Sequence, residues 1–162
     1  ATILPDKIAK TLTSLTYGYT PATDATEGWY YKIVDITTSA SAFIGTETFM
    51  QKGSGAAGVN AGSSMPAVTG SDQVRFLFIQ HTGKRDDGST SNTADSIYVC
   101  FDNDNAAHNN TDNIEIGPGE SWFGKLNGCA SSRIYAISGQ KAGAGTGGNS
   151  IQALVAAVIK DV

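Results

Sequence analysis

The sequence predicts an all-β protein, an antiparallel β-sandwich, jelly roll or barrel with long loops rich in Gly, Ser and Asn. Between residues 94 and 138, short apolar segments alternate with turn sequences, as they do in small β-domains. Charged residues make up only 16% of the chain, and Thr, Ser, Asn and Gly supply the polar surface instead. No internal repeat is visible, which argues against a propeller or a solenoid.

Two strands are expected in the first third of the chain. Trp29–Thr37 alternates between apolar and polar residues as a strand does, and Ala42–Gln51 is a second candidate. The next segment, Gly53–Ser64, consists almost entirely of Gly, Ala, Ser and Asn, so it cannot bury enough side chain to fold alone. We expect it to be a long loop or an arm.

The strongest strand signal follows at Gln73–Gln80. This segment is apolar on both faces, which predicts a central strand. The next segment, His81–Ala94, is charged and contains Gly, and we expect it to be a hairpin connection to a strand at Ser96–Phe101.

Three shorter strands are expected after residue 110. Asn113–Ile116 and Ser121–Phe123 flank the Gly-Pro-Gly turn at Gly117–Glu120, and Ile134–Ser138 follows a loop. A further Gly-rich loop is expected at Gln140–Asn149.

The last segment, Ser150–Val162, is rich in Ala and compatible with a helix, but a strand is favoured because the elements before it are β. This gives seven or eight strands in a single domain. Residues 21–162 are expected to form the β-sandwich, and residues 1–20 an N-terminal arm or first strand.

Charge and hydropathy argue against two classes of partner. The net charge is −4 and no basic patch is visible, so no nucleic-acid partner is expected. The longest apolar run, Ala153–Ile159, is far shorter than a membrane span, and no leader segment is visible, so no membrane partner is expected. Removal of an initial methionine would leave Ala1 first, and we expect synthesis in the cytoplasm.

Two glycine motifs are candidates for nucleotide binding, and two histidines are candidates for catalysis or metal binding. Gly143–Gly148 and Gly53–Gly58 match G-x-G-x-x-G, but neither continues into a complete dinucleotide-binding unit, so flexible loops are expected. His81 and His108 fall at strand–loop edges, where we expect exposed polar side chains. No Gly-x-Ser-x-Gly nucleophile motif occurs.

The acidic residues and the cysteines also favour structural roles. Glu115 and Glu120 are interpreted as outward residues on two paired strands rather than as a catalytic acid pair. For Asp102–Asn105, turn hydrogen bonding is favoured over calcium binding. Cys100 and Cys129 are expected to be partly buried thiols, and two cysteines cannot supply a four-ligand zinc site. We therefore predict no enzyme activity, no cofactor, and no catalytic or metal-binding residue.

The aromatic side chains are too numerous for all of them to face one small core. Exposed aromatic rings are typical of a sugar-stacking platform or of a protein interface. The residues concerned are Trp29, Tyr30, Tyr31, Trp122, Phe123 and Tyr135.

The strand and turn sequences Ile97–Phe101, Asn113–Ile116, Gly117–Glu120, Ser121–Phe123 and Ile134–Ser138 resemble small structural proteins of tailed bacteriophages. The resemblance covers about a quarter of the chain. It implies a jelly-roll-like capsid decoration (cement) protein, on the virion surface, that binds the major capsid protein and itself. The alternatives are a tail or head-fibre component and a carbohydrate-binding β-sandwich.

A decoration protein would bind its neighbours through apolar strand faces and through arms that add strands to a neighbour's sheet edge. The segments expected to act as arms are Ala1–Leu15 and Gly53–Ser64. The residues predicted to lie in an interface are Ile3, Leu4, Leu12, Trp29, Tyr30, Trp122 and Phe123.

Overall fold

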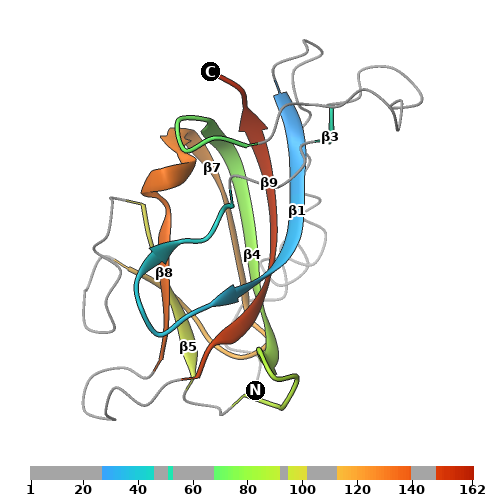
Figure 1. Cartoon of the computed structure of the whole chain (residues 1–162), viewed down its shortest axis with the longest axis vertical. Helices are drawn as coiled ribbons and strands as arrows, with labels where there is room; N and C mark the ends of the chain where they lie inside the picture. The colour runs from blue at the N-terminus through green and yellow to red at the C-terminus, as the bar shows by residue number, and fades with distance from the viewer. Residues whose placement is uncertain (1–26, 46–50, 53–67, 92–94, 102–112, 140–148) are drawn as a thin grey trace, which may run out of the picture.

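The computed structural model describes residues 27–45, 51–52, 68–91, 95–101, 113–139 and 149–162, which form nine β-strands and one 3-10 turn (Figure 1). The elements in chain order are β1 (Glu27–Ile36), β2 (Ser41–Ala42), β3 (Gln51–Lys52), β4 (Gln73–Arg85), β5 (Ser96–Cys100), β6 (Ile114–Ile116), β7 (Ser121–Ala130), η1 (Ser131–Arg133), β8 (Tyr135–Gly139) and β9 (Ile151–Lys160).

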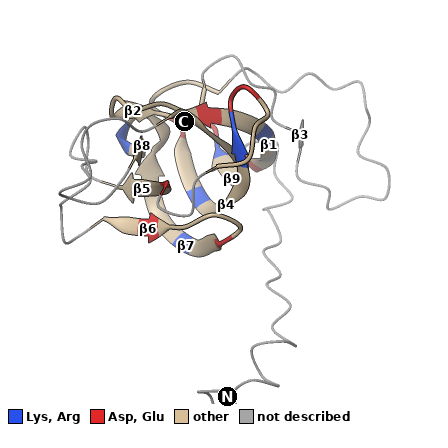
Figure 2. Ribbon diagram, turned by 90° about the horizontal axis from the view of Figure 1, so that it is seen from below, with Lys and Arg blue, Asp and Glu red and all other residues tan. Residues whose placement is uncertain are grey.

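The strands form two antiparallel sheets, so the predicted all-β sandwich is confirmed. One sheet has the strand order β3-β1-β9-β4-β7 and the other the order β2-β8-β5-β6. Figure 2 looks along the strands and shows the two layers, with basic and acidic positions interspersed rather than gathered by sign.

Strand pairing is nested along the chain. β1 pairs with β9, β2 with β8, β4 with β7, and β5 with β6, so the outermost pair joins the two ends of the described chain. The pairs β4–β9 and β5–β8 connect these hairpin-like pairs into the two sheets.

The core between the sheets is mainly aliphatic. Leu77 and Ile79 of β4 face Ile97 and Val99 of β5 across it, and all four side chains are fully buried. Because side chains alternate along a strand, every second residue enters this core. Full burial of one such side chain stabilises the fold by about 1.5–3 kcal/mol.

The central position predicted for Gln73–Gln80 is confirmed, because β4 lies between β9 and β7. The final segment is a strand, as favoured: β9 pairs with β1 on one side and with β4 on the other. Its burial alternates from Ile151 to Ala157, as expected of a strand with one face in the core.

Two predicted elements differ from the structure. The candidate strand Ala42–Gln51 is not one strand, because β2 and β3 belong to different sheets. The connection predicted at His81–Ala94 does not join two paired strands, because β4 continues to Arg85 and β5 lies in the other sheet. A local hairpin turn does lie within it, since Lys84 pairs with Thr90 and the N–H of Ser91 donates to the carbonyl of Gly83. Pairing with β9 supplies backbone partners as far as Arg85, which lets polar residues extend the strand.

The aromatic strand predicted at Ser121–Phe123 is longer than expected. β7 runs to Ala130 because β4 pairs with it from Gln73 to Gln80. Cys100 and Cys129 are thiols, as predicted, and the Cys129 sulfur donates to the carbonyl of Phe101 at 3.5 Å.

Several predictions lie outside the described residues. They concern the N-terminal arm, Gly53–Ser64, residues 140–148, Asp102–Asn105 and His108. Among the residues that are described, no helix is long and apolar enough to cross a bilayer.

Candidate interaction surface

The outer face of the five-stranded sheet is the most distinctive surface of the described chain. In a sandwich, inward residues fill the core and outward residues normally meet water and are polar. Tyr30, Ala157 and Leu77 lie opposite one another on β1, β9 and β4, and all belong to the core. Their neighbours along each strand therefore face outward.

The strand register arranges the outward residues in three rows across β1, β9, β4 and β7. All of these residues except Lys125, Gln80 and Ser121 are apolar or aromatic, and we call this surface the outer apolar face. From β9 to β7 the first row contains Val158, Phe76 and Lys125 and the second Ala156, Phe78 and Phe123; the third runs from β1 to β7 and contains Ile33, Leu154, Gln80 and Ser121.

The exposed part of the outer apolar face lies at its two sides. Phe123 on β7 is 41% exposed and Ile33 on β1 is 55% exposed, whereas Phe76 and Val158 in the middle are buried. A partner that covered this face would meet Phe123 on one side and Ile33 on the other.

Trp122 and Phe123 are adjacent but face opposite sides of the sheet. Trp122 packs against the core, and its ring lies 5.4 Å from that of Phe101. Gly124 leaves room for the indole of Trp122, because a Cβ at position 124 would lie only 2.8 Å from Cη2 of that ring. A sugar-stacking site needs an open indole face, so this placement of Trp122 argues against such a role.

The residues predicted for the interface lie in different places. Phe123 is on the outer apolar face, and the backbone of Trp29 pairs with Val158, but the Trp29 side chain lies outside the described part of the structure. Tyr30 is fully buried in the core, and Trp122 is half-buried against it. Ile3, Leu4 and Leu12 lie outside the described residues.

Sequence reasoning missed Ile33, Phe78 and Leu154 as members of this surface. The signal was present in Gln73–Gln80, whose apolar residues on both faces require a second covering surface in addition to the core. Only the register shows that Ile33 and Leu154 continue the same face.

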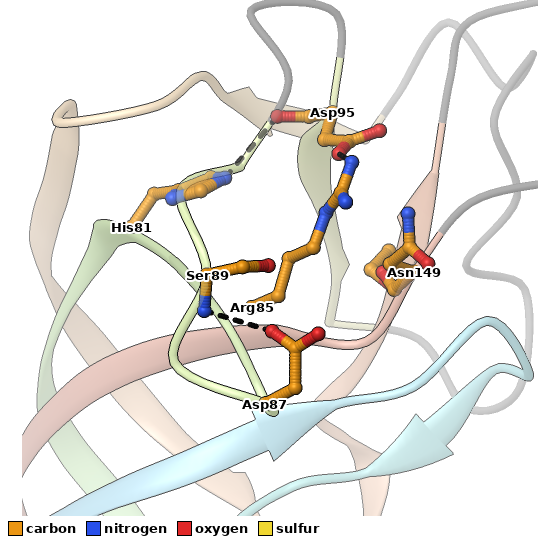
Figure 3. Close-up of polar contacts among 7 residues, drawn as sticks. His81, Arg85, Asp87, Ser89, Asp95 and Asn149 are labelled. Carbon is orange, nitrogen blue, oxygen red and sulfur yellow. Dashed lines mark hydrogen bonds and ion pairs between the residues drawn. The ribbon is translucent and has the colours of Figure 1, made fainter.

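A polar cluster at the end of β4 is the other candidate site (Figure 3). Arg85 forms an ion pair of 3.3 Å with the buried carboxylate of Asp95. The side-chain amide of Asn149 is oriented with its oxygen toward Arg85. This oxygen accepts hydrogen bonds from Nε and Nη2 of Arg85, both at 3.2 Å. These contacts join the end of β4 to the residues that precede β5 and β9.

His81 is fully buried, so the prediction of an exposed histidine at this position is wrong. Its Nδ1 accepts from the N–H of Gly83 at 2.9 Å, which requires the proton to lie on Nε2. Nε2 then donates to the main-chain carbonyl of Asp95, 3.1 Å away. β4 continues past His81, so this residue is not at the end of the strand. The two hydrogen bonds of the imidazole take the place of bonds to water.

The resemblance of this cluster to a Ser-His-Asp site is superficial. Both ring nitrogens of His81 are bonded to the main chain, so neither is left to take a proton from a hydroxyl. Ser89 instead closes a turn: its N–H donates to the Asp87 carboxylate at 2.8 Å, and its hydrogen bonds lower the pKa of Asp87.

The two glutamates flanking the Gly-Pro-Gly turn also have structural contacts. Glu115 accepts from the hydroxyls of Ser96 and Tyr98, both at 3.1 Å, and Glu120 accepts from the N–H of Gly117 at 2.8 Å. The prediction that they lie on two paired strands is wrong, because Glu115 is on β6, Glu120 precedes β7, and these strands belong to different sheets. Burial, followed by the Glu115 charge, raises the pKa of Tyr98.

No group of three His, Cys, Asp or Glu residues within the described ranges could hold a metal ion. Comparison with protein families, curated proteins and solved structures gave no match to this chain.

Acid is expected to destabilise the fold through His81. Burial lowers the pKa of His81 below 6.5, against the opposing effects of the Asp95 carbonyl and of the Asp95 and Glu120 charges. The unfolded chain therefore binds a proton more readily, and stability falls as the pH drops below about 6.5, by at most about 1.4 kcal/mol per pH unit. Urea unfolding between pH 7.5 and 5 measures this slope.

His81→Gln is expected to reduce that slope. An unchanged slope in His81→Gln would show that other groups cause the acid sensitivity.

Proposed function

We propose that this protein is a non-enzymatic virion component of a tailed bacteriophage, a capsid decoration protein that binds and stabilises the major capsid protein shell. It acts by burying surface at the shell, and binding only the assembled state stabilises that state by mass action. The observation that carries this proposal is the outer apolar face, with Phe123 and Ile33 exposed at its sides.

The strand order supports a jelly-roll fold, which the resemblance implies. Without the two-residue strand β3, each sheet has four strands, and the pairs β1–β9, β2–β8, β4–β7 and β5–β6 are nested. An eight-stranded double sheet of this kind is the architecture of jelly rolls, which are frequent in viral capsids and in lectins. The fold alone does not decide between these two functions.

The polar contacts support binding rather than catalysis. The buried histidine and the acidic residues near it make hydrogen bonds that hold strand ends together. The exposed side chains of Phe123 and Ile33, in contrast, have a physical reason to be covered by a partner, since burying apolar area contributes about 25 cal/mol per Å².

The proposal is tested by co-sedimentation of the purified protein with assembled shells of the major capsid protein from the same phage. Phe123→Asp is expected to weaken binding at least about tenfold, because it buries a charge in the contact. Asn127→Asp, which adds the same charge further along β7, is the matched control and should bind like the wild type.

Equal binding by Phe123→Asp and wild type would contradict a role for the outer apolar face. If the wild-type protein does not sediment with shells, decoration is contradicted. Binding to purified tails or fibres, or saturable binding on a glycan array, would then identify the alternative function.

A further inference from the structure

A bulge in β7 places an asparagine and a glycine next to each other outside the regular strand pairing. Between the paired residues Lys125 and Cys129, three residues of β7 lie opposite the single residue Arg75 of β4. A bulge of this kind interrupts the hydrogen-bonded ladder locally. Asn127 is exposed within it, and Gly128 follows with a φ of 74°, a conformation that favours glycine. The main chain is therefore less constrained at this dipeptide than in the paired part of β7.

An asparagine followed by glycine can lose its side-chain ammonia without an enzyme. Hydroxide removes the proton of the Gly128 N–H, and this nitrogen attacks the side-chain carbonyl carbon of Asn127. A carbon–nitrogen bond forms, the bond to the side-chain nitrogen breaks, and ammonia leaves with a proton from water. Water then opens the cyclic imide at either carbonyl and yields aspartate or isoaspartate. Glycine favours the attack because it has no side chain to hinder its nitrogen.

The guanidinium of Arg75 lies against this glycine. A Cβ built on Gly128 would be 3.0 Å from Nη1 of Arg75. The cation is thus at most about 4.5 Å from the Gly128 Cα, which is one carbon–carbon bond further away. Arg75 is half-buried, its Nε is buried without a hydrogen-bond partner, and no carboxylate among the described residues forms an ion pair with it.

This cation favours the two anions that the reaction passes through. A positive charge stabilises the deprotonated form of a neighbouring group and an oxyanion that develops beside it. The deprotonated amide of Gly128 is the first anion, and the tetrahedral oxyanion on the Asn127 side chain is the second. The uncompensated charge of Arg75 therefore lowers the barrier to ring closure at this dipeptide.

Asp87 and Gly88 form the other acidic or amide residue followed by glycine within the described ranges, and their turn holds both reacting groups. The N–H of Gly88 donates to the carbonyl of Arg85 at 2.9 Å. The Asp87 carboxylate accepts from the N–H of Ser89 at 2.8 Å. An ionised carboxylate is also a poorer electrophile than an amide, so ring closure is expected at Asn127 rather than at Asp87.

We propose that Asn127 is a site of spontaneous deamidation in the folded protein and that the Arg75 guanidinium accelerates the reaction. The product carries a new negative charge on β7, and its isoaspartate form lengthens the main chain of the bulge by one carbon. The reaction requires only water and hydroxide, so the site stands independently of the proposed function.

The experiment incubates the folded full-length protein at pH 8.5 in water enriched in heavy oxygen, and then digests it with trypsin in ordinary water. Cleavage after Lys125 and Arg133 releases residues 126–133, in which Asn127 is the only side-chain amide. Deamidation replaces the side-chain nitrogen with one labelled oxygen, which mass spectrometry detects in this peptide. The same chain unfolded in urea gives the reference rate. The folded wild type is expected to convert at no less than about one tenth of that rate.

Substitutions at Arg75 test the contribution of the fold, at temperatures well below the unfolding transition of each variant. Arg75→Gln should slow conversion of the folded protein at least about threefold and leave the rate in urea unchanged. Arg75→Lys retains the positive charge and should retain most of the wild-type rate. Lys160→Gln is the matched control, because Lys160 pairs with Gln73 from β9, on the side of β4 away from β7. It should convert like the wild type.

Asn127→Gln is the control for the site itself, because glutamine would have to close a larger ring. It should remove the labelled mass gain from the peptide, and a gain that persisted would overturn the assignment to Asn127. Absence of labelled product in the folded wild type, while the unfolded chain converts, would overturn the proposal. Equal rates for folded Arg75→Gln and wild type would overturn the acceleration by the guanidinium. No capsid is involved, so these results leave the test of shell binding separate.

Discussion

Trp122→Ala is expected to lower the free energy of unfolding by about 3 kcal/mol, because it leaves a cavity beside the core. The indole packs on the core and on Phe101, and Gly124 leaves space for it. Phe123→Ala, one residue further on, removes a ring that is 41% exposed and should cost less than about 1 kcal/mol.

Denaturant unfolding of the two variants measures this difference in stability. Co-sedimentation with shells measures how strongly each variant binds. Phe123→Ala should weaken binding with little change in stability, and Trp122→Ala should do the reverse when assayed well below its unfolding transition. Loss of glycan binding in a stable Trp122→Ala protein would instead support the carbohydrate-binding alternative.

Arg85→Met is expected to cost about 3 kcal/mol of stability, since it removes the cation from a buried carboxylate. Asp95 is almost fully buried, and Arg85 bonds both to it and to Asn149. The methionine retains much of the apolar stem, so the loss reports on the charge and the hydrogen bonds rather than on packing.

Lys84→Met is the matched control for this variant. Lys84 is exposed, and its ammonium donates to the Thr90 hydroxyl at 3.4 Å. Its replacement should change stability by less than about 0.5 kcal/mol. Equal effects of the two substitutions would contradict a structural role for the Arg85–Asp95 pair.

The sequence predicted those elements whose side chains alternate or are apolar throughout. Gln73–Gln80 was recognised as central because its apolar residues occupy both faces, and β4 indeed lies between two strands. Apolar residues on both faces of this segment also indicate a second apolar surface outside the core. Only the strand register shows that Phe78 and Phe123 are neighbours there and that Ile33 belongs to the same surface.

The errors arose where long-range pairing outweighs local sequence. The polar residues after His81 looked like a connection, yet pairing with β9 extends the strand to Arg85. His81 was expected at the surface because histidine is polar, and its burial depends on a carbonyl fourteen residues away that no local pattern reveals. Strand partners in a nested topology are likewise set by contacts across the whole chain.

Quantitative mass spectrometry of virus particles purified from the source of this protein tests the central claim most directly. Decoration predicts a copy number comparable with that of the major capsid protein, retained through a density gradient. A few copies per particle, or absence from the particle, would contradict the assignment as a capsid decoration protein.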